Sequence, residues 1–383
     1  MLVPFTNLSL HHQPLTTQFI ATLEKHLENS NLILGQTVAD FEIQFANFCH
    51  KPYCVTVNSG TDALTLALLA YDIGPGDEVI TAPNSFFATA ESIHHTGAKV
   101  VFADISSDTY TLDPRQVAQK ITSKTKAIIP VHLYGQPADM DPLIKLAKQH
   151  HLHIIEDCCQ AHGAQYNNRP VPYTATGIFS FVAAKNLGSL GDGGAIVTNQ
   201  AVIAKRLQYL RNHGSLKKYH HQYLGFNSRL DALQAAFLSL KLPHLSTWNR
   251  LRQQHAALYS ELLQNLPQLT LPQPVDYANH VYHLYVIRTL HRDRLQTYLE
   301  SHGISTVIHY PIPIHLQPPY RKQGYRRGDF PITESLTGQI LSLPLFPELT
   351  KEQIKYVCQT IKNFYPINFY SIPQLHSYRL PLS

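Results

Sequence analysis

The sequence has few charged residues and no long apolar run. Asp, Glu, Lys and Arg make up 15% of the 383 residues, whereas 44% are hydrophobic and 10% aromatic, a balance typical of a compact globular chain and not of a disordered one. No segment approaches the roughly 18 consecutive apolar residues that a membrane-spanning helix needs. The first residues also lack the basic start, apolar stretch and cleavage site of an export signal. We therefore expect a cytoplasmic protein with no membrane partner.

Cysteine and strong charge are also scarce. The five cysteines have no regular spacing and form no C-x-x-C pair, which is typical of reduced thiols. The net charge is +5 without clustered basic runs, so we expect no nucleic-acid partner, and a small anionic ligand fits better. Neither G-x-x-x-x-G-K-[ST] nor G-x-G-x-x-G occurs, so a P-loop and a dinucleotide site have no support. The histidines form adjacent pairs whose side chains point to different faces, so we expect no metal site.

Short β-branched runs alternate with helical periods over the first two hundred residues. This alternation predicts an α/β fold with a mostly parallel sheet covered by helices on both faces. The predicted strands are Tyr53–Val57, Glu78–Ala82, Lys99–Ala103, Ala127–Leu133, His153–Glu156, Ile178–Val182 and Ala195–Thr198. The main predicted helices between them are Thr61–Tyr71, Ser85–His95, Asp139–His150 and Ala201–His213. The pairs Asp113-Pro114 and Asp141-Pro142 are typical of an N-cap acid followed by proline at the first helical position.

A change of pattern near residue 265 predicts a second domain. A long helix is expected from Arg229 to about Asn265 with an interruption near Pro243, and a proline-rich stretch follows it. We predict a large domain over 1–265, a small α+β domain over 266–364 and an extended tail over 365–383. In the small domain we expect strands at Tyr282–Arg288 and Ser305–His309 and helices at Arg292–His302 and Lys351–Phe364.

Three strand ends carry residues that suit one ligand. Ligands of open parallel sheets collect at the carboxyl ends of the strands. Small and hydroxyl residues at Asn58–Asp62 suit a phosphate at a helix start, or an ordinary N-cap. Asp157 ends a buried strand and needs a cationic or hydrogen-bonding partner, unless it caps the following turn. Lys185 follows an apolar strand, where its amine suits Schiff-base chemistry, or an exposed loop position.

Together, a phosphate holder, an acid and an amine describe a pyridine aldehyde phosphate site. Asp157 would hold a proton on the ring nitrogen, and Lys185 would form the imine. The runs 58–64 (NSGTDAL), 156–163 (EDCCQAHG), 185–188 (KNLG) and 191–194 (GDGG) resemble the DegT family of pyridoxal-phosphate sugar aminotransferases. So do residues 33–35, 225–236 and 341–344. The resemblance covers nearly the whole chain and implies a fold-type-I aminotransferase that forms a homodimer with active sites shared across the interface.

The resemblance also implies roles for individual residues. Lys185 would be the catalytic lysine, which forms the imine and shuttles the proton, with Asp157 on the pyridinium and Gln160 against the ring hydroxyl. The remaining cofactor residues implied are Ser59, Gly60, Thr61 and Ser180 on the phosphate, Asn227 from the other subunit, and Phe87 stacked on the ring. A lysine at position 185 argues for transamination, because a dehydratase branch of the family has histidine there.

Residues 211–219 and 309–317 resemble the branch that aminates C3 of nucleotide-linked 3-keto-6-deoxyhexoses. A sugar diphosphate requires cations and aromatic rings outside the cofactor pocket. The expected substrate residues are Lys218, Tyr219, Arg250, His309 and Tyr310. We expect L-glutamate as the amino donor and dTDP as the nucleotide. The alternatives are amination at C4 of a 4-keto sugar, and a regulatory protein that keeps the cofactor pocket without turnover.

Overall fold

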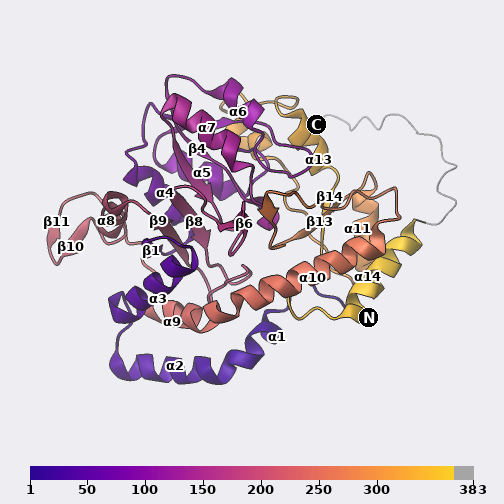
Figure 1. The fold of residues 1–383 in the computed structure, drawn as a ribbon, viewed down its shortest axis with the longest axis horizontal. Coiled ribbons are helices and arrows are strands. Elements are labelled where there is room, and N and C mark those ends of the chain that lie inside the picture. Colours follow the sequence, from indigo (N-terminus) through magenta and orange to yellow (C-terminus); the bar gives the residue numbers. More distant parts are fainter. Residues whose placement is uncertain (366–383) are drawn as a thin grey trace.

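Seven strands form the central sheet of the computed structural model, which describes residues 1–365 (Figure 1). The strand order is β1–β9–β8–β5–β4–β2–β3, and only β9 runs antiparallel to its neighbours. The bounds are β1 Tyr53–Val57, β2 Glu78–Thr81, β3 Lys99–Phe102, β4 Thr125–Ile129, β5 His153–Asp157, β8 Thr176–Ser180 and β9 Gly194–Thr198. The predicted α/β fold with a mostly parallel sheet is therefore confirmed.

Helices cover both faces of this sheet, as the predicted alternation requires (Figure 1). Ile178 and Phe179 are successive residues of β8, and each is fully buried in a different apolar cluster. Successive strand residues point to opposite faces, so neither face is open to solvent here. The surrounding helices are α3 Gly35–Phe48, α4 Gly60–Ala70, α5 Phe87–His95, α6 Pro114–Lys120, α7 Met140–His150, α8 Ala201–Leu210 and α9 Ala232–Lys241.

Helix starts follow the predicted rules at one position and not at another. Asp113 is the N-cap of α6 and accepts a hydrogen bond from Arg115 N, with proline at the first position, as predicted. The prediction for Asp141 as an N-cap is wrong, because α7 already begins at Met140. Tyr166 Oη accepts a hydrogen bond from Asp141 N and donates one to Asp139, so a distant tyrosine sets this helix start.

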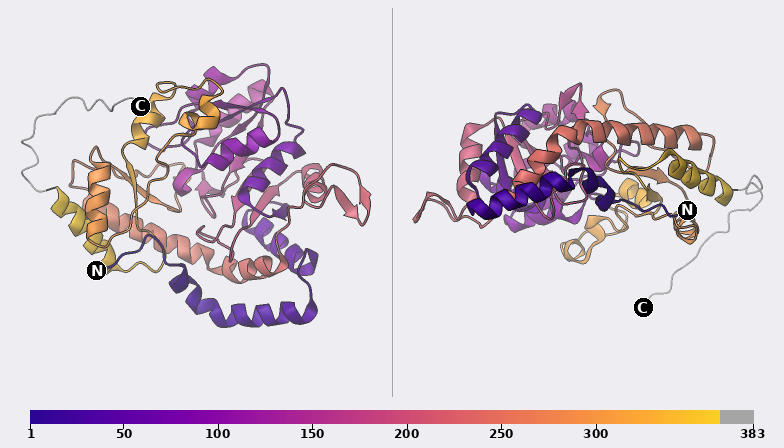
Figure 2. Two further views of the ribbon diagram at one scale, coloured as in Figure 1. Left: turned by 180° about the vertical axis from the view of Figure 1, so that it is seen from behind. Right: turned by 90° about the horizontal axis from the view of Figure 1, so that it is seen from below.

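The long helical stretch is broken where proline predicts it. Helix α9 ends at Lys241, a 3-10 turn spans Leu242–His244, and α10 continues over Leu245–Leu263. The second half of α10 shares an apolar cluster with the C-terminal elements (Figures 1 and 2). These are β13 Tyr285–Arg288, α11 Arg292–Ser301, β14 Ile340–Leu343 and α14 Lys351–Phe364.

One predicted strand of the C-terminal region is wrong. Residues 305–309 form no strand, and only Val307 makes a single bridge, to Ser342. The partner of β13 is instead β14, which is antiparallel to it and which the sequence pattern did not reveal. The division into domains at residue 265 stays a prediction. The predicted tail 365–383 lies outside the described residues except for Tyr365, which is buried.

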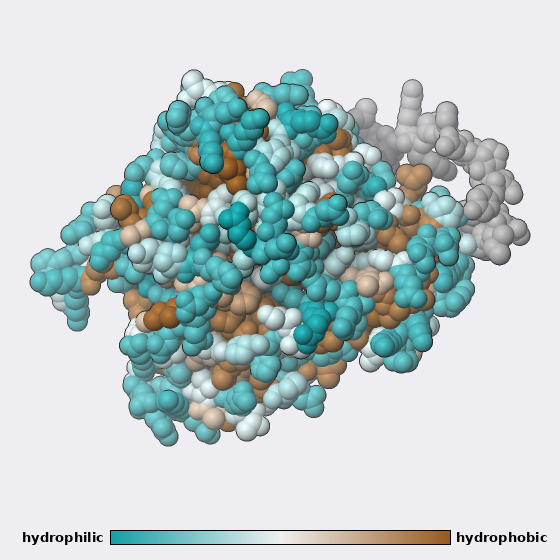
Figure 3. All heavy atoms as spheres, viewed as in Figure 1, coloured by the Kyte–Doolittle hydropathy of each residue, from teal (hydrophilic) through white to brown (hydrophobic). Residues whose placement is uncertain are grey.

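Two smaller features lie at the edges of the molecule. The N-terminal helices α1 Leu8–His12 and α2 Thr16–Asn29 run below the sheet in Figure 1. A short hairpin of β10 Ser215–Lys217 and β11 His220–His221 projects from the body in every view (Figures 1 and 2). The face in Figure 3 is mostly hydrophilic with scattered apolar patches.

Candidate active site

A cavity of about 470 Å³ lies at the carboxyl ends of β1, β5 and β8. Parallel strands whose ends meet at one edge of the sheet bring together residues far apart in the sequence. The predicted site residues that line this cavity are Ser59, Gly60, Thr61, Asp157, Gln160, Ser180, Lys185, His309 and Tyr310. The amine, the acid and the helix start therefore share one cavity.

The N-terminus of α4 forms the floor for an anion. Ser59 is the N-cap, and its Oγ accepts a hydrogen bond from Asp62 N at 3.0 Å, so the capping role is real and the hydroxyl proton remains to be donated. A Cβ atom on Gly60 would lie 2.8 Å from Ser180 Cβ and 3.2 Å from Cys159 Sγ. Glycine is needed at position 60 because a Cβ there would collide with Ser180 and Cys159, which approach the start of α4 closely. Backbone N–H groups at a helix start bind phosphate well.

The carboxylate of Asp157 is held by neutral donors. Thr89 Oγ1 donates to Oδ2 at 2.9 Å, and the Cys159 N–H donates to Oδ1 at 3.1 Å. The Cys159 contact caps the turn after β5, so the partner and the capping role that the sequence left open are both present. The Asp157 N–H donates a hydrogen bond to the Pro130 carbonyl, and the Asp157 carbonyl accepts one from the His132 N–H. The acid is buried, yet no salt bridge joins it to a cation among residues 1–365.

Lys185 lies in a turn five residues after β8, where its N–H donates to the Val182 carbonyl. Burial lowers the pKa of Lys185 below the usual lysine value, and the negative charge of Asp157 opposes this shift. Burial and the charge of Lys185 also lower the pKa of His309, to about 4. The imidazole of His309 is therefore neutral near pH 7. It places no second positive charge beside the side chain of Lys185.

Gln160 is fixed between two segments at the edge of the cavity. Its Oε1 accepts from Tyr134 N at 2.7 Å, and its Nε2 donates to Tyr310 Oη at 3.1 Å. His309 Nδ1 lies 2.9 Å from Ser342 Oγ. The side chains of Gln160, His309 and Tyr310 are therefore oriented by contacts with other elements.

The structure corrects the predicted stacking residue. Phe87 does not line the cavity, because its ring packs on Tyr320 at 5.7 Å between centroids and joins the core under α5. The preceding Phe86 lines the cavity instead, is 57% exposed and lies 5.7 Å from the ring of Tyr310. Phe86 is the N-cap of α5, and the change from extended to helical backbone turns neighbouring side chains to different sides.

Four further predicted residues, besides Phe87, lie outside this cavity. Asn227 is exposed and forms a bridge with Asn212 beside the projecting hairpin. Lys218 and Tyr219 are at the hairpin tip, with the ammonium 5.1 Å from the tyrosine ring centre. Arg250 is exposed on α10, 3.5 Å from Thr247 Oγ1. The chain itself does not bring these residues to its own cavity.

Several other lining residues were not predicted as site residues, among them Ser85, Thr89 and His283. Ser85 and Thr89 line the cavity from the start of α5, and His283 lines it from the loop before β13. His283 Nδ1 lies 3.0 Å from Asn186 Oδ1, which connects it to the residue after Lys185. Ser85 and Thr89 fall in a segment that resembles the family, but the contact of Thr89 with Asp157 spans 68 residues, and the sequence pattern carries no signal for it.

Within residues 1–365, His132, Glu156 and Cys158 are the only group of three side chains close enough to hold a metal ion. Both oxygens of Glu156 already accept hydrogen bonds, from His132 and Tyr173 and from Thr174. His132 Nδ1 accepts from Ala138 N, so Nε2 carries the proton that it donates to Glu156. Burial raises the pKa of the Cys158 thiol well above its usual value. These atoms have no free lone pair aimed at an ion, so the group is structural.

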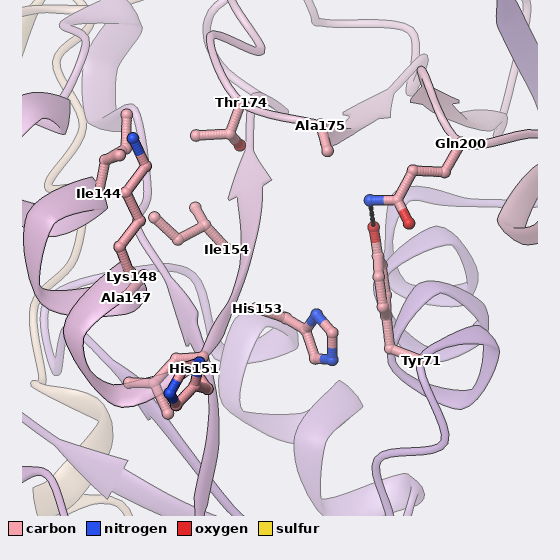
Figure 4. Close-up of a pocket in the computed structure, with 11 residues that line it drawn as sticks. Tyr71, Ile144, Ala147, Lys148, His151, His153, Ile154, Thr174, Ala175 and Gln200 are labelled. Atoms are coloured by element: carbon pink, nitrogen blue, oxygen red, sulfur yellow. Dashed lines mark hydrogen bonds between the residues drawn. The ribbon is translucent and has the colours of Figure 1, made fainter.

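A second cavity, of about 420 Å³, lies at the opposite, amino ends of β5 and β8 (Figure 4). His153 faces the ring of Tyr71, whose hydroxyl accepts a hydrogen bond from Gln200 at 3.0 Å (Figure 4). Lys148 and His151 border it from the end of α7. None of the described residues that line this cavity is an acid, so it does not share the chemistry of the first. No helix within residues 1–365 is long and apolar enough to cross a membrane.

The fold and the first cavity define the class of protein: an α/β enzyme that places a lysine, an acid and an anion-binding helix start at the sheet's carboxyl edge. A family model described as the DegT/DnrJ/EryC1/StrS aminotransferase family matches residues 14–362. The chain therefore belongs to the DegT/DnrJ/EryC1/StrS aminotransferase family, as the sequence resemblance predicted.

Relatives of known name cover almost the whole chain. A "pleiotropic regulatory protein" of Geobacillus stearothermophilus is 46% identical over 95% of this chain and 99% of its own. A "dTDP-3-amino-3,6-dideoxy-alpha-D-galactopyranose transaminase" of Aneurinibacillus thermoaerophilus is 44% identical over 95% and 99%.

Solved structures share the fold closely. The crystal structure of Streptomyces venezuelae DesV in complex with a ketimine intermediate superposes with a TM-score of 0.93, at 43% identity over 94% of this chain and 98% of that one. The Bacillus subtilis NtdA structure with bound cofactor PMP has a TM-score of 0.90, at 33% identity over 94% and 85%.

Proposed function

We propose that the chain is a pyridoxal-phosphate-dependent 3-aminotransferase of sugar nucleotides. It transfers the amino group of L-glutamate to C3 of a dTDP-linked 3-keto-6-deoxyhexose. The observation that carries this proposal is the cavity in which Lys185 and Asp157 face the N-terminus of α4. The 44% identity to a dTDP-3-amino sugar transaminase and the PMP-bound neighbour support it.

The residues of the cavity fit the cofactor. The start of α4 at Gly60 suits a phosphate, with Ser59, Thr61 and Ser180 as donors that line the cavity beside it. The buried carboxylate of Asp157 has no cationic partner among residues 1–365, so it is free to pair with a protonated ring nitrogen. Lys185 supplies the amine that binds an aldehyde. Phe86 would cover the ring face in place of Phe87.

The mechanism follows from what these side chains do. Pyridoxal phosphate, when bound, supplies an electron sink that stabilises negative charge on the carbon next to the transferred nitrogen. Asp157 holds the proton on the ring nitrogen. Lys185 Nζ, whose lowered pKa favours the neutral amine, removes the proton from the α carbon of glutamate and delivers a proton to C3 of the sugar. Gln160, held by Tyr134 and Tyr310, orients the ring hydroxyl.

A homodimer would complete this site. The hairpin and the residues after it expose a series of apolar side chains: Leu216, Tyr219, Tyr223, Leu224 and Phe226. Clustered exposed apolar residues are typical of interaction surfaces. Asn227 follows directly, and in a dimer it would reach the phosphate of the other subunit, with Lys218, Tyr219 and Arg250 near the nucleotide. Sedimentation of the wild type and of Leu224→Asp tests this, since a monomeric wild type would contradict it.

The deciding experiment supplies L-glutamate and either a 3-keto or a 4-keto dTDP-6-deoxyhexose. We expect mass spectrometry and NMR to find an amine at C3 with the 3-keto sugar, and none with Lys185→Ala. Borohydride reduction followed by peptide mass spectrometry should place the cofactor on Lys185. Amination only at C4 would favour the first alternative. An adduct at Lys185 without conversion of any amino donor would favour the regulatory alternative, to which the name of the Geobacillus relative points.

A further inference from the structure

Two hydroxyl groups form a chain that ends on the acid of the site. Thr89 Oγ1 lies 2.9 Å from Asp157 Oδ2, and Ser85 Oγ lies 2.8 Å from Thr89 Oγ1. All three residues are buried and line the cavity. Thr89 thus connects α5 with the end of β5, 68 residues away.

The direction of the two hydrogen bonds follows from proton counting. An ionised carboxylate only accepts, so Thr89 must donate its single proton to Asp157. That proton is then committed, so Ser85 must donate to Thr89. The order is Ser85 to Thr89 to Asp157, and each donation strengthens the next because the groups polarise one another.

The chemistry of these donors suits an acid that must keep its charge. A lysine or arginine in the place of Thr89 would pair with Asp157 and neutralise it, whereas a hydroxyl orients the carboxylate and leaves its full charge. The other oxygen is restrained by the Cys159 N–H. With one neutral donor on each oxygen, the rotamer of Asp157 is fixed while lone pairs remain for the cavity.

The requirements of helix α5 do not explain why residue 89 is a threonine. Threonine is an unfavourable residue inside a helix, and its hydroxyl there often bonds to a carbonyl one turn back. Thr89 Oγ1 instead points away from its helix to Asp157. Ser92, on the same helix and also buried, donates to the Thr89 carbonyl and so serves only the helix.

We propose that Ser85 and Thr89 are positioning residues, which orient the Asp157 carboxylate toward the pyridinium nitrogen of the cofactor. This inference rests on the proposed function, because it assumes a pyridoxal phosphate ring in the cavity. The relay would act on cofactor affinity and on the protonation of the ring, and not on the fold as a whole.

Four variants test the relay. Thr89→Val removes the hydroxyl and keeps the shape, Thr89→Ser restores the hydroxyl, and Ser85→Ala removes only the outer donor. Ser92→Ala is the matched control. The measurements are the Kd of pyridoxal phosphate by absorbance titration of the apoprotein, the pH titration of the bound cofactor's absorbance, kcat and KM, and the Tm of the apoprotein.

We expect Thr89→Val to weaken cofactor binding about 10- to 100-fold, as for loss of a hydrogen bond to a charged group, and to move the pH titration. Ser85→Ala should show the same changes to a smaller extent, with kcat reduced more than KM is changed. Thr89→Ser should restore wild-type values, and Ser92→Ala should match the wild type.

The relay is refuted if Thr89→Val or, where that variant does not fold, Ser85→Ala binds the cofactor and titrates like the wild type. It is also refuted if Thr89→Ser is as impaired as Thr89→Val, because packing of the methyl group would then be the cause. Failure of the proposed function is distinguishable: a wild type that binds the cofactor but aminates no 3-keto sugar contradicts that function, and the affinities still decide the relay.

Discussion

Replacing Glu156 by alanine should destabilise this protein more than any other removal of a single charge that we consider. Glu156 precedes the cofactor acid on β5 and is 0% exposed. One oxygen accepts from His132 Nε2 at 2.9 Å and from Tyr173 N at 2.8 Å, and the other accepts from the N–H and hydroxyl of Thr174. Removing this side chain leaves one fully buried donor and three part-buried donors without their acceptor.

The magnitude follows from these lost partners. Each buried donor left unsatisfied costs about 1–3 kcal/mol, and hydrogen bonds to a charged group such as this carboxylate lie at the upper end of that range. Water entering the space left by Glu156 would restore some of these bonds. We therefore expect the free energy of unfolding to fall by about 3–5 kcal/mol in Glu156→Ala and by about 1–3 kcal/mol in Glu156→Gln, which keeps one acceptor oxygen. A change of this size is a large part of the roughly 5–15 kcal/mol that stabilises a typical protein.

The pH dependence of the free energy of unfolding provides an independent test of this argument. Burial alone would raise the pKa of Glu156, but the hydrogen bond and charge of His132, together with hydrogen bonds from Thr174, outweigh burial and lower it. Because the folded pKa lies below the unfolded value of about 4.3, the stabilisation is present above pH ~4.3 and is lost as the pH falls below that value. Glu156→Gln should lack this part of the acid sensitivity.

Urea unfolding of the apoprotein, followed by circular dichroism between pH 7 and about pH 3, measures both effects. Glu261→Ala, at an exposed position of α10, is the control and should change stability by less than about 0.5 kcal/mol. If Glu156→Ala unfolded at the wild-type urea concentration, or if Glu156→Gln lost stability with acid as the wild type does, the argument from buried acceptors would be wrong.

The remaining predictions concern the cavity and one buried lysine. Gly60→Ala should weaken phosphate and pyridoxal phosphate binding at least tenfold in titrations, because the new Cβ would lie 2.8 Å from Ser180 Cβ. Gly74→Ala is the control and should bind normally, since its Cβ would lie 3.5 Å from the nearest atom. Phe86→Ala should lower cofactor affinity with little change in Tm, because Phe86 lines the cavity. Phe87→Ala should instead lower the free energy of unfolding by about 2–4 kcal/mol, since only Phe87 packs in the core. Equal Tm losses in the two variants would contradict the assignment. Burial lowers the pKa of Lys241 to about 8, so the unfolded chain binds more protons than the folded protein between pH 8 and about 10.4. The free energy of unfolding should therefore rise with pH in this range, by up to about 3 kcal/mol relative to Lys241→Met. A pH-independent difference between the two proteins would refute this.

Local patterns were sufficient for most of the sheet and for finding an acid and an amine that share one cavity. The β-branched runs located all seven strands of the central sheet, and Pro243 located the break between α9 and α10. The motifs around Asp157 and Lys185 lie next to their strand ends, so their meeting in one cavity follows from the parallel topology alone.

Residues whose role depends on distant contacts escaped the sequence pattern. The choice of Phe86 over Phe87 depends on where α5 begins, and the strand partner of β13 depends on a segment some fifty residues further along. Nothing local marks Thr89 as the partner of Asp157, or His132 as the partner of Glu156.

The amino-acid order by itself determined the α/β class, the family and the proposal of an amine and an acid at the strand ends, because periodicity and short motifs are local properties. Tertiary structure alone decided which aromatic ring faces the cavity, which hydroxyls contact Asp157 and which glycine is packed too closely for a side chain. Those outcomes depend on distances of a few ångströms between segments that are far apart in the chain, and no local pattern encodes such distances.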